Sequence, residues 1–308
     1  MTLIVADCLD VLATMPPGSV DLVVTSPPYN IALGYASYDD TRPDADYLDW
    51  MTRVAVALER VLAVGGSVFL NLSGSNAKPW LPFELITRLR PVFQLQNHIT
   101  WIKSIAVGDT ASGHYKPVGG ARFLHPMHEH VFQLTKTGRV PLDRLAIGVP
   151  FQDKSNIARR GHARDLRCRG NTWFIPYRTV NSRAEKFHHP AGFPVTLPLW
   201  CIHLVGGQPR VLDPFAGAGT TLVAAARAGV PGIGIEIDPI YASIARDRLT
   251  ADDHHRVTLT PAQMAALPAR VRERGNQSTG AIALTPSERR PDTSPSRVDR
   301  PPATGLLL

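Results

Sequence analysis

A glycine-rich loop between a predicted strand and a predicted helix restricts this chain to few folds. The loop Asp213-Pro-Phe-Ala-Gly-Ala-Gly-Thr-Thr221 follows an apolar strand at 210–213 and leads into a helix at 220–228. Glycines in that place let a ligand approach backbone N–H groups and a helix N-terminus. A strand at 232–237 and a helix at 239–249 come next, in the order typical of a parallel sheet.

The first part of the chain shows the same alternation. Asp7 is placed to cap one predicted helix, and Gly65-Gly66 to end another. We therefore predict an α/β fold with one doubly wound, mainly parallel sheet that both regions share. The predicted strands are 3–6, 20–25, 67–71, 98–103 and 128–134, and the predicted helices are 7–15, 46–64 and 81–92.

Between the two regions lies a segment that carries the net charge of the chain. The 308 residues include 33 Lys and Arg against 26 Asp and Glu, a formal charge of +7. Residues 154–187 alone hold nine basic and two acidic side chains, also +7. Arginines predominate, and guanidinium groups bind phosphate and guanine in bidentate fashion, so the pattern favours DNA over the alternative of a solvated loop. The candidate DNA contacts are Arg159, Arg160, Arg164, Arg167, Arg169 and Asn171.

These patterns divide the chain into four segments. Residues 1–138 hold the first α/β region, 139–187 the basic segment without long periodicity, and 188–267 the second α/β region. Residues 268–308 are rich in Arg, Pro, Ser, Thr and Gly, and we predict that they are disordered.

Other features argue against several classes of protein. The three cysteines form no Cys-x-x-Cys pair, so neither a disulfide framework nor a thiolate zinc site is expected. The segment His125-Pro-Met-His-Glu-His130 offers too few ligands for zinc, so we predict a packed strand and no metal. The absence of a leader pattern and of an apolar run of roughly 20 residues indicates a soluble, cytoplasmic protein without membrane contact.

Glu236 lies at the end of the strand that follows the glycine loop, 23 positions after Asp213. From that place a carboxylate can bind both hydroxyls of a ribose. Leu222 stands where a dinucleotide fingerprint has a third glycine, and Gly219-Thr-Thr lacks the lysine of a triphosphate-binding loop. The pattern favours a nucleoside, although a glycine turn that only packs a helix on the sheet remains an alternative.

A second motif, Thr25-Ser-Pro-Pro-Tyr-Asn30, follows the predicted strand 20–25. Open α/β sheets bind ligands at this carboxyl end of their strands. Proline lacks an N–H group and restricts the residue before it, so the loop is stiff and its carbonyl groups can accept hydrogen bonds. Such a loop beside an aromatic ring suits a flat amine, although an ordinary strand exit has the same pattern.

Together, the segments 25–30 and 213–221 resemble the amino-methyltransferases of DNA, which use S-adenosyl-L-methionine to methylate cytosine N4 or adenine N6. The order of the motifs is similar to the β class, and the resemblance covers residues 3–250. It implies a Rossmann-like methyltransferase fold with a catalytic half at 1–138, a target-recognition segment at 139–187 and a cofactor-binding half at 188–267. Ser26 resembles the cytosine-N4 members more than the adenine-N6 members, which stay the second possibility.

The resemblance also implies roles for individual residues. Ser26 and Pro27 would accept the N–H groups of the target amine, and Tyr29, beyond Pro28, would stack on a base flipped out of the duplex. The expected cofactor contacts are Asp7, Cys8, Asp213, Phe215, Ala216, Gly217, Gly219, Thr220, Thr221, Glu236, Ile237, Pro190 and Phe193.

The expected partner is double-stranded DNA, and the resemblance leaves a companion restriction endonuclease and a homodimer open. Carbon-5 methylation is disfavoured because Cys8, Cys168 and Cys201 do not follow a proline. A protein-glutamine methyltransferase usually has Asn before the Pro-Pro-Tyr loop and the cofactor loop first. A DNA-binding regulator with a dead methylation site is disfavoured because the residues of both motifs are intact.

Overall fold

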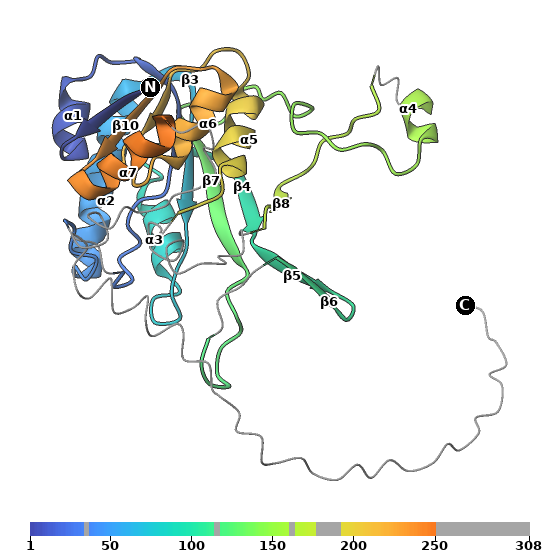
Figure 1. Cartoon of the computed structure of the whole chain (residues 1–308), viewed down its shortest axis with the longest axis horizontal. Helices are drawn as coiled ribbons and strands as arrows, with labels where there is room; N and C mark the ends of the chain where they lie inside the picture. Colours follow the sequence, from blue (N-terminus) through green and yellow to red (C-terminus); the bar gives the residue numbers. More distant parts are fainter. Residues whose placement is uncertain (34–36, 114–117, 160–163, 177–191, 251–308) are drawn as a thin grey trace, which may run out of the picture.

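The computed structural model describes residues 1–33, 37–113, 118–159, 164–176 and 192–250. Its centre is an eight-stranded sheet in the order β1-β10-β9-β2-β3-β7-β4-β8, next to a separate hairpin, β5-β6 (Figure 1). The strands are β1 (Thr2–Val5), β2 (Val20–Thr25), β3 (Leu62–Leu72), β4 (Gln94–Ile102), β5 (Ser104–Val107), β6 (Thr110–Gly113), β7 (His128–Thr135), β8 (Thr172–Phe174), β9 (Val211–Asp213) and β10 (Gly232–Glu236). The helices are α1 (Cys8–Thr14), α2 (Asp44–Val61), α3 (Leu81–Arg88), α4 (Ser155–Arg159), α5 (Thr196–Val205), α6 (Thr220–Ala228) and α7 (Pro239–Thr250).

The sheet is mainly parallel, as predicted. Among its described strands, β7 alone runs antiparallel to its neighbours, β3 and β4. Strand β9 of the second region pairs with β2 of the first, with Leu22 opposite Val211 and Val23 opposite Leu212. The prediction of one doubly wound α/β sheet is therefore confirmed, and loops from both regions meet at the carboxyl edge of this strand pair.

Helices cover both faces of the sheet (Figure 1). Along β2, Val23 packs in the core cluster that contains Leu12 of α1, whereas Leu22 and Val24 pack in the cluster that contains Leu197 of α5. Side chains alternate between the two faces of a strand. Because both faces of β2 are buried, its sequence is an almost continuous apolar run.

Gly65 and Gly66 do not end a helix, contrary to the prediction. Helix α2 ends at Val61, and both glycines lie inside strand β3. A Cβ atom on Gly66 would lie 2.9 Å from the backbone oxygen of Asp21, next to the register shift between β2 and β3. Gly66 therefore serves the close approach of two strands, whereas a Cβ atom on Gly65 would meet nothing within 4 Å. In the sequence, this tertiary requirement looks like a helix stop.

Several elements were not predicted from periodicity. Helix α5 is apolar on most sides, so its sequence lacks an amphipathic pattern. The hairpin β5-β6 is mostly exposed. It projects from the same side of the molecule as the arm that carries α4, which consists of residues 149–159 and 164–167 and is closed by the bridge between Val149 and Arg167 (Figure 1). Within the described ranges, every helix is too short or too polar to span a bilayer. The predicted disordered segment 268–308 lies outside the described residues.

Candidate active site

A pocket opens at the carboxyl edge of the sheet, where loops after β1, β2, β9 and β10 meet. It combines Ser26 and Pro28 of the Ser-Pro-Pro-Tyr loop with Phe215 and Glu236 of the predicted cofactor region. The pocket is lined by Ala6, Asp7, Cys8, Ser26, Pro28, Ser37, Tyr38, Asp39, Arg42, Trp50, Pro214, Phe215, Ile235, Glu236, Ile237, Asp238 and Tyr241.

Asp213 joins the two predicted loops from beneath the pocket. Its carboxylate accepts hydrogen bonds from Thr25 Oγ1 and Thr221 Oγ1, both at 2.7 Å, and from the backbone N–H of Phe215 at 3.1 Å. Burial raises the pKa of Asp213 to about 6, and these hydrogen bonds oppose the rise. Because Asp213 is buried and absent from the pocket lining, its contacts organise the site.

Glu236 is held at the pocket wall by two backbone groups. The N–H of Gly217 donates to Oε2 at 2.6 Å, and the N–H of Asp238 donates to Oε1 at 2.9 Å. Burial raises the pKa of Glu236 to about 7. A carboxylate has about four acceptor sites, so each oxygen can accept one further hydrogen bond.

Two glycines shape the loop beside Glu236. Gly217 and Gly219 have φ values of 50° and 75°, a left-handed conformation that glycine adopts without steric cost. A Cβ atom on Gly219 would also lie 2.8 Å from the side chain of Ala245 in α7. Loop conformation and helix packing both require glycine at position 219.

Asp7 caps α1, as predicted, because its Oδ1 accepts the N–H of Leu9 at 2.8 Å. It lines the pocket together with Cys8 and Ile237. Burial raises the pKa of Cys8 to about 12, so the thiol stays neutral. Cys8 therefore supplies an apolar wall and no nucleophile.

The pocket has an aromatic wall in which Phe215 was predicted as a cofactor contact, whereas Tyr38 and Trp50 were not. The Tyr38 and Trp50 rings lie 5.3 Å apart between centroids, and the Trp50 and Phe215 rings 5.5 Å. The Arg42 guanidinium carbon lies 4.6 Å from the centroid of Tyr38. Residue spacing offered no signal for this wall, because its members come from a loop, from α2 and from the glycine loop.

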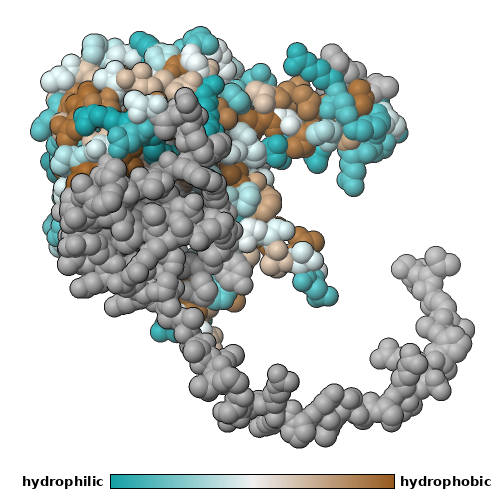
Figure 2. All heavy atoms as spheres, in the orientation of Figure 1, coloured by the Kyte–Doolittle hydropathy of each residue, from teal (hydrophilic) through white to brown (hydrophobic). Residues whose placement is uncertain are grey.

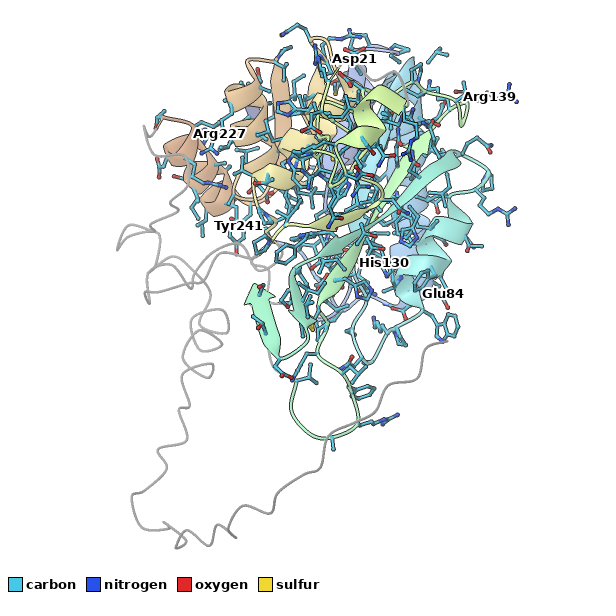
Figure 3. The ribbon with its side chains drawn as sticks, turned by 90° about the vertical axis from the view of Figure 1, so that its right-hand side faces the viewer. Asp21, Glu84, His130, Arg139, Arg227 and Tyr241 are labelled. Atoms are coloured by element: carbon cyan, nitrogen blue, oxygen red, sulfur yellow. The ribbon has the colours of Figure 1, made fainter. Side chains whose placement is uncertain are left out.

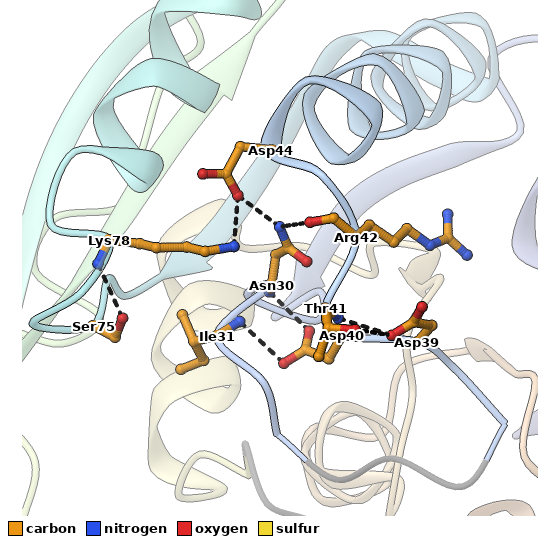
Figure 4. Close-up of polar contacts among 9 residues, drawn as sticks. All are labelled: Asn30, Ile31, Asp39, Asp40, Thr41, Arg42, Asp44, Ser75 and Lys78. Carbon is orange, nitrogen blue, oxygen red and sulfur yellow. Dashed lines mark hydrogen bonds and ion pairs between the residues drawn. The ribbon is translucent and has the colours of Figure 1, made fainter.

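The described parts of the loop before α2 are fixed by a polar cluster (Figure 4). Asp40 accepts the backbone N–H groups of Asn30 at 2.8 Å and Ile31 at 3.1 Å. The side chain of Asn30, whose φ is 56°, donates to Asp44 at 2.8 Å, and Lys78 pairs with the same carboxylate at 2.6 Å. These contacts join the end of the Ser-Pro-Pro-Tyr-Asn segment to the loop whose residues Ser37, Tyr38, Asp39 and Arg42 line the pocket.

Tyr29 is buried behind Ser26. Its ring packs in the core cluster next to α2, and its hydroxyl lies 2.7 Å from Ser26 Oγ. Pro27 and Tyr29 do not line the pocket in the described residues, whereas Ser26 and Pro28 do. The stacking role of Tyr29 stays a prediction.

The predicted DNA contacts fall into two groups. Arg159, Arg164 and Arg167 have exposed side chains on the arm that carries α4, whose end is largely hydrophilic (Figure 2). Arg169 instead donates to the backbone oxygen of Ile147 at 2.8 Å and stacks on Trp200, and Asn171 donates to the backbone oxygen of His98 at 2.9 Å. These last two side chains are thus engaged within the protein. Arg160 lies outside the described residues.

Two further predicted positions lie away from the described pocket. Phe193 packs against the core cluster beneath α5 and does not line the pocket, and Pro190 lies outside the described residues. Of the residues labelled in Figure 3, Tyr241 on α7 lines the pocket, whereas His130 on β7 does not. No group of three His, Cys, Asp or Glu side chains in the described part of the chain could hold a metal ion.

The sequence is similar to DNA methyltransferases over most of its length. The profile of the family described as DNA methylase (N6_N4_Mtase) matches residues 20–247. DNA adenine methyltransferase YhdJ of Escherichia coli (strain K12) is 29% identical over 264 residues, which cover 82% of this chain and 84% of the relative. Type II methyltransferase M.BglII of Bacillus subtilis is 29% identical over 267 residues, which cover 80% of this chain and 68% of the relative.

Solved structures share the fold. PvuII DNA methyltransferase (cytosine-N4-specific) superposes with a TM-score of 0.61 at 19% identity and covers 89% of this chain and 91% of its own. The protein TTHA0409 of Thermus thermophilus, solved in complex with S-adenosyl-L-methionine, gives a TM-score of 0.53 at 27% identity. The match covers 80% of this chain and 92% of TTHA0409. Because the family profile spans both the Ser-Pro-Pro-Tyr loop and the glycine loop, this chain belongs to the N4/N6 DNA methylase family.

Proposed function

We propose that this DNA methyltransferase transfers the methyl group of S-adenosyl-L-methionine to the exocyclic amine of a flipped base, with cytosine N4 preferred. The observation that carries the proposal is that Ser26 and Pro28 line the same pocket as Phe215 and Glu236. The residues expected to bind the target amine and those expected to bind the nucleoside therefore face one cavity. The preference for cytosine rests on Ser26 as the first residue of the catalytic loop.

The pocket residues fit the chemistry of S-adenosyl-L-methionine. Glu236 retains acceptor capacity for the two ribose hydroxyls, and the aromatic wall of Tyr38, Trp50 and Phe215 offers flat surfaces to a purine. TTHA0409, similar in sequence and fold, was solved with this molecule. When bound, it would supply an activated methyl group.

In the proposed reaction, the protein orients the amine. Ser26 and the Pro27 carbonyl accept its two N–H bonds and direct the nitrogen lone pair at the methyl group. Positioning of this kind can supply several kcal/mol of the rate enhancement. The cysteines take no part, in line with the neutral thiol of Cys8.

Adenine N6 is the second candidate target, because the relative YhdJ is named a DNA adenine methyltransferase. Either base presents an exocyclic amine to the same acceptors. The exposed arginines of the α4 arm, Arg159, Arg164 and Arg167, would bind double-stranded DNA in both cases.

One experiment tests the reaction and its target. The purified full chain is incubated with labelled S-adenosyl-L-methionine and duplex DNA of mixed sequence, and the digested nucleosides are analysed by mass spectrometry. Labelled N4-methylcytosine would support the proposal. Labelled N6-methyladenine would show that the target base is adenine and not cytosine, and DNA without label would refute the proposal. Analysis by gel filtration, with and without DNA, would test for a homodimer.

A further inference from the structure

A buried carboxylate that the sequence analysis did not assign lies behind the Ser-Pro-Pro-Tyr loop. Glu129 of β7 is 8% exposed. Its Oε2 accepts hydrogen bonds from Tyr29 Oη at 3.0 Å and from Asn71 Nδ2 at 2.8 Å, and its Oε1 pairs with Lys103 Nζ at 3.0 Å. The Lys103 ammonium balances the buried negative charge.

Counting protons assigns a direction to the hydrogen bonds around Tyr29. The phenol has one proton, and it goes to Glu129, because an ionised carboxylate can only accept. Asn71 Nδ2, 2.7 Å away, donates to Tyr29 Oη. Tyr29 Oη also lies 2.7 Å from Ser26 Oγ, and because the phenol proton goes to Glu129, Ser26 is the donor in this contact.

This direction matters for the pocket that Ser26 lines. With its proton committed to Tyr29, Ser26 Oγ can present lone pairs to the pocket, as an acceptor of amine N–H groups must. Without the carboxylate, Tyr29 can donate to Ser26, and the serine proton is then free to point into the pocket as a competing donor. The Glu129 carboxylate thus decides whether Ser26 Oγ acts as an acceptor or as a donor of hydrogen bonds in the pocket.

We propose that Glu129 and Lys103 are positioning residues that act through Tyr29 to keep Ser26 Oγ a hydrogen-bond acceptor towards the target amine. The inference rests on the proposed function, since it assumes that the amine binds at Ser26. Neither residue lines the pocket, so cofactor binding should not depend on them.

A double-mutant cycle tests the pair. Glu129→Gln, Tyr29→Phe and the double variant are compared with wild type for kcat, KM for DNA and Kd for S-adenosyl-L-methionine. Each single substitution should lower kcat about 10- to 100-fold, the typical range for the loss of a group that orients a functional residue through a hydrogen bond. The Kd should stay within about twofold of wild type. Because Glu129 acts through Tyr29, the double variant should be no more than about twofold slower than Tyr29→Phe.

Two variants keep the test decisive. Glu59→Gln is the matched control, because it removes the carboxylate of an ion pair with Lys136 outside the pocket, and it should match wild type. If Glu129→Gln does not fold, Lys103→Met enters the same cycle with Tyr29→Phe. Multiplicative losses in the double variant, an unchanged kcat, or a loss of cofactor binding would each overturn the inference. Inactive wild type overturns the proposed function itself, and this inference with it.

Discussion

The hydroxyl of Thr25 donates to Oδ1 of Asp213 at 2.7 Å and joins residues that lie 188 positions apart. Thr25 is the last residue of β2, directly before Ser26, and Asp213 is the last residue of β9, directly before the glycine loop. Because β2 and β9 are parallel neighbours, their ends meet at one edge. One buried hydrogen bond therefore aligns the predicted catalytic loop with the predicted cofactor loop.

Thr25→Val should destabilise the protein by about 1–3 kcal/mol, because it removes one donor from a buried carboxylate while keeping the side-chain shape. Urea unfolding followed by circular dichroism measures the change. Thr14→Val, at an exposed helix position, is the control and should change stability by less than about 0.5 kcal/mol. Equal effects of both substitutions would show that the contact with Asp213 contributes nothing specific.

Cofactor binding should weaken as the pH falls through about 7. The raised pKa of Glu236 means that it takes up a proton in this range, and a protonated carboxyl accepts fewer hydrogen bonds from ribose hydroxyls. Calorimetry should show Kd rising by up to about tenfold per pH unit well below pH 7. Glu236→Gln should bind more weakly, without this dependence, and a wild-type Kd that is constant from pH 8 to 6 would contradict the assignment.

The same raised pKa has an opposite consequence for the free protein. A carboxyl group whose pKa is higher in the folded than in the unfolded state contributes most to stability at low pH. The contribution from Glu236 should therefore be lost as the pH rises from about 4 to about 7. Chemical unfolding between pH 5 and 8 should show a smaller decline in the unfolding free energy of Glu236→Gln than in that of wild type.

Trp50→Leu should raise the Kd for S-adenosyl-L-methionine about tenfold, because the ring lies between Tyr38 and Phe215 in the pocket wall. Titration calorimetry gives the constant. Trp80→Leu removes a ring that is 71% exposed and should leave Kd unchanged. Unaltered binding in Trp50→Leu would exclude the aromatic wall from the cofactor site.

Arg159→Glu combined with Arg164→Glu should raise the Kd for duplex DNA and flatten its salt dependence. Each lost phosphate contact lowers the slope of log K against log salt by about 0.9. Fluorescence anisotropy at several salt concentrations measures both quantities. Arg53→Glu combined with Arg227→Glu, exposed on α2 and α6, has the same change in net charge and is the control. An arm double variant with the wild-type slope would rule out DNA binding by Arg159 and Arg164.

Local backbone chemistry made much of the fold predictable. Strand β2 and helix α6 have the predicted bounds. An apolar run marks the strand, and a glycine at each end marks the helix, so both signals lie within the element or directly next to it. The alternation of elements predicted the mainly parallel sheet, and the two loop motifs predicted the family. The segment Gly65-Gly66 was wrongly predicted to end a helix, because a glycine such as Gly66 serves a helix end and a close strand contact equally well.

The sequence by itself determined the class of fold, the two loop motifs and the segment that carries the net charge, because each depends on neighbouring residues. The tertiary structure alone decided that Trp50 and the loop residues Ser37, Tyr38, Asp39 and Arg42 line the pocket. It also decided that Glu129 meets Tyr29 across 100 positions. Such contacts depend on strand order and pairing. A linear pattern shows that strands exist, but not which of them are neighbours, so the partners of a buried charge become visible only in the folded chain.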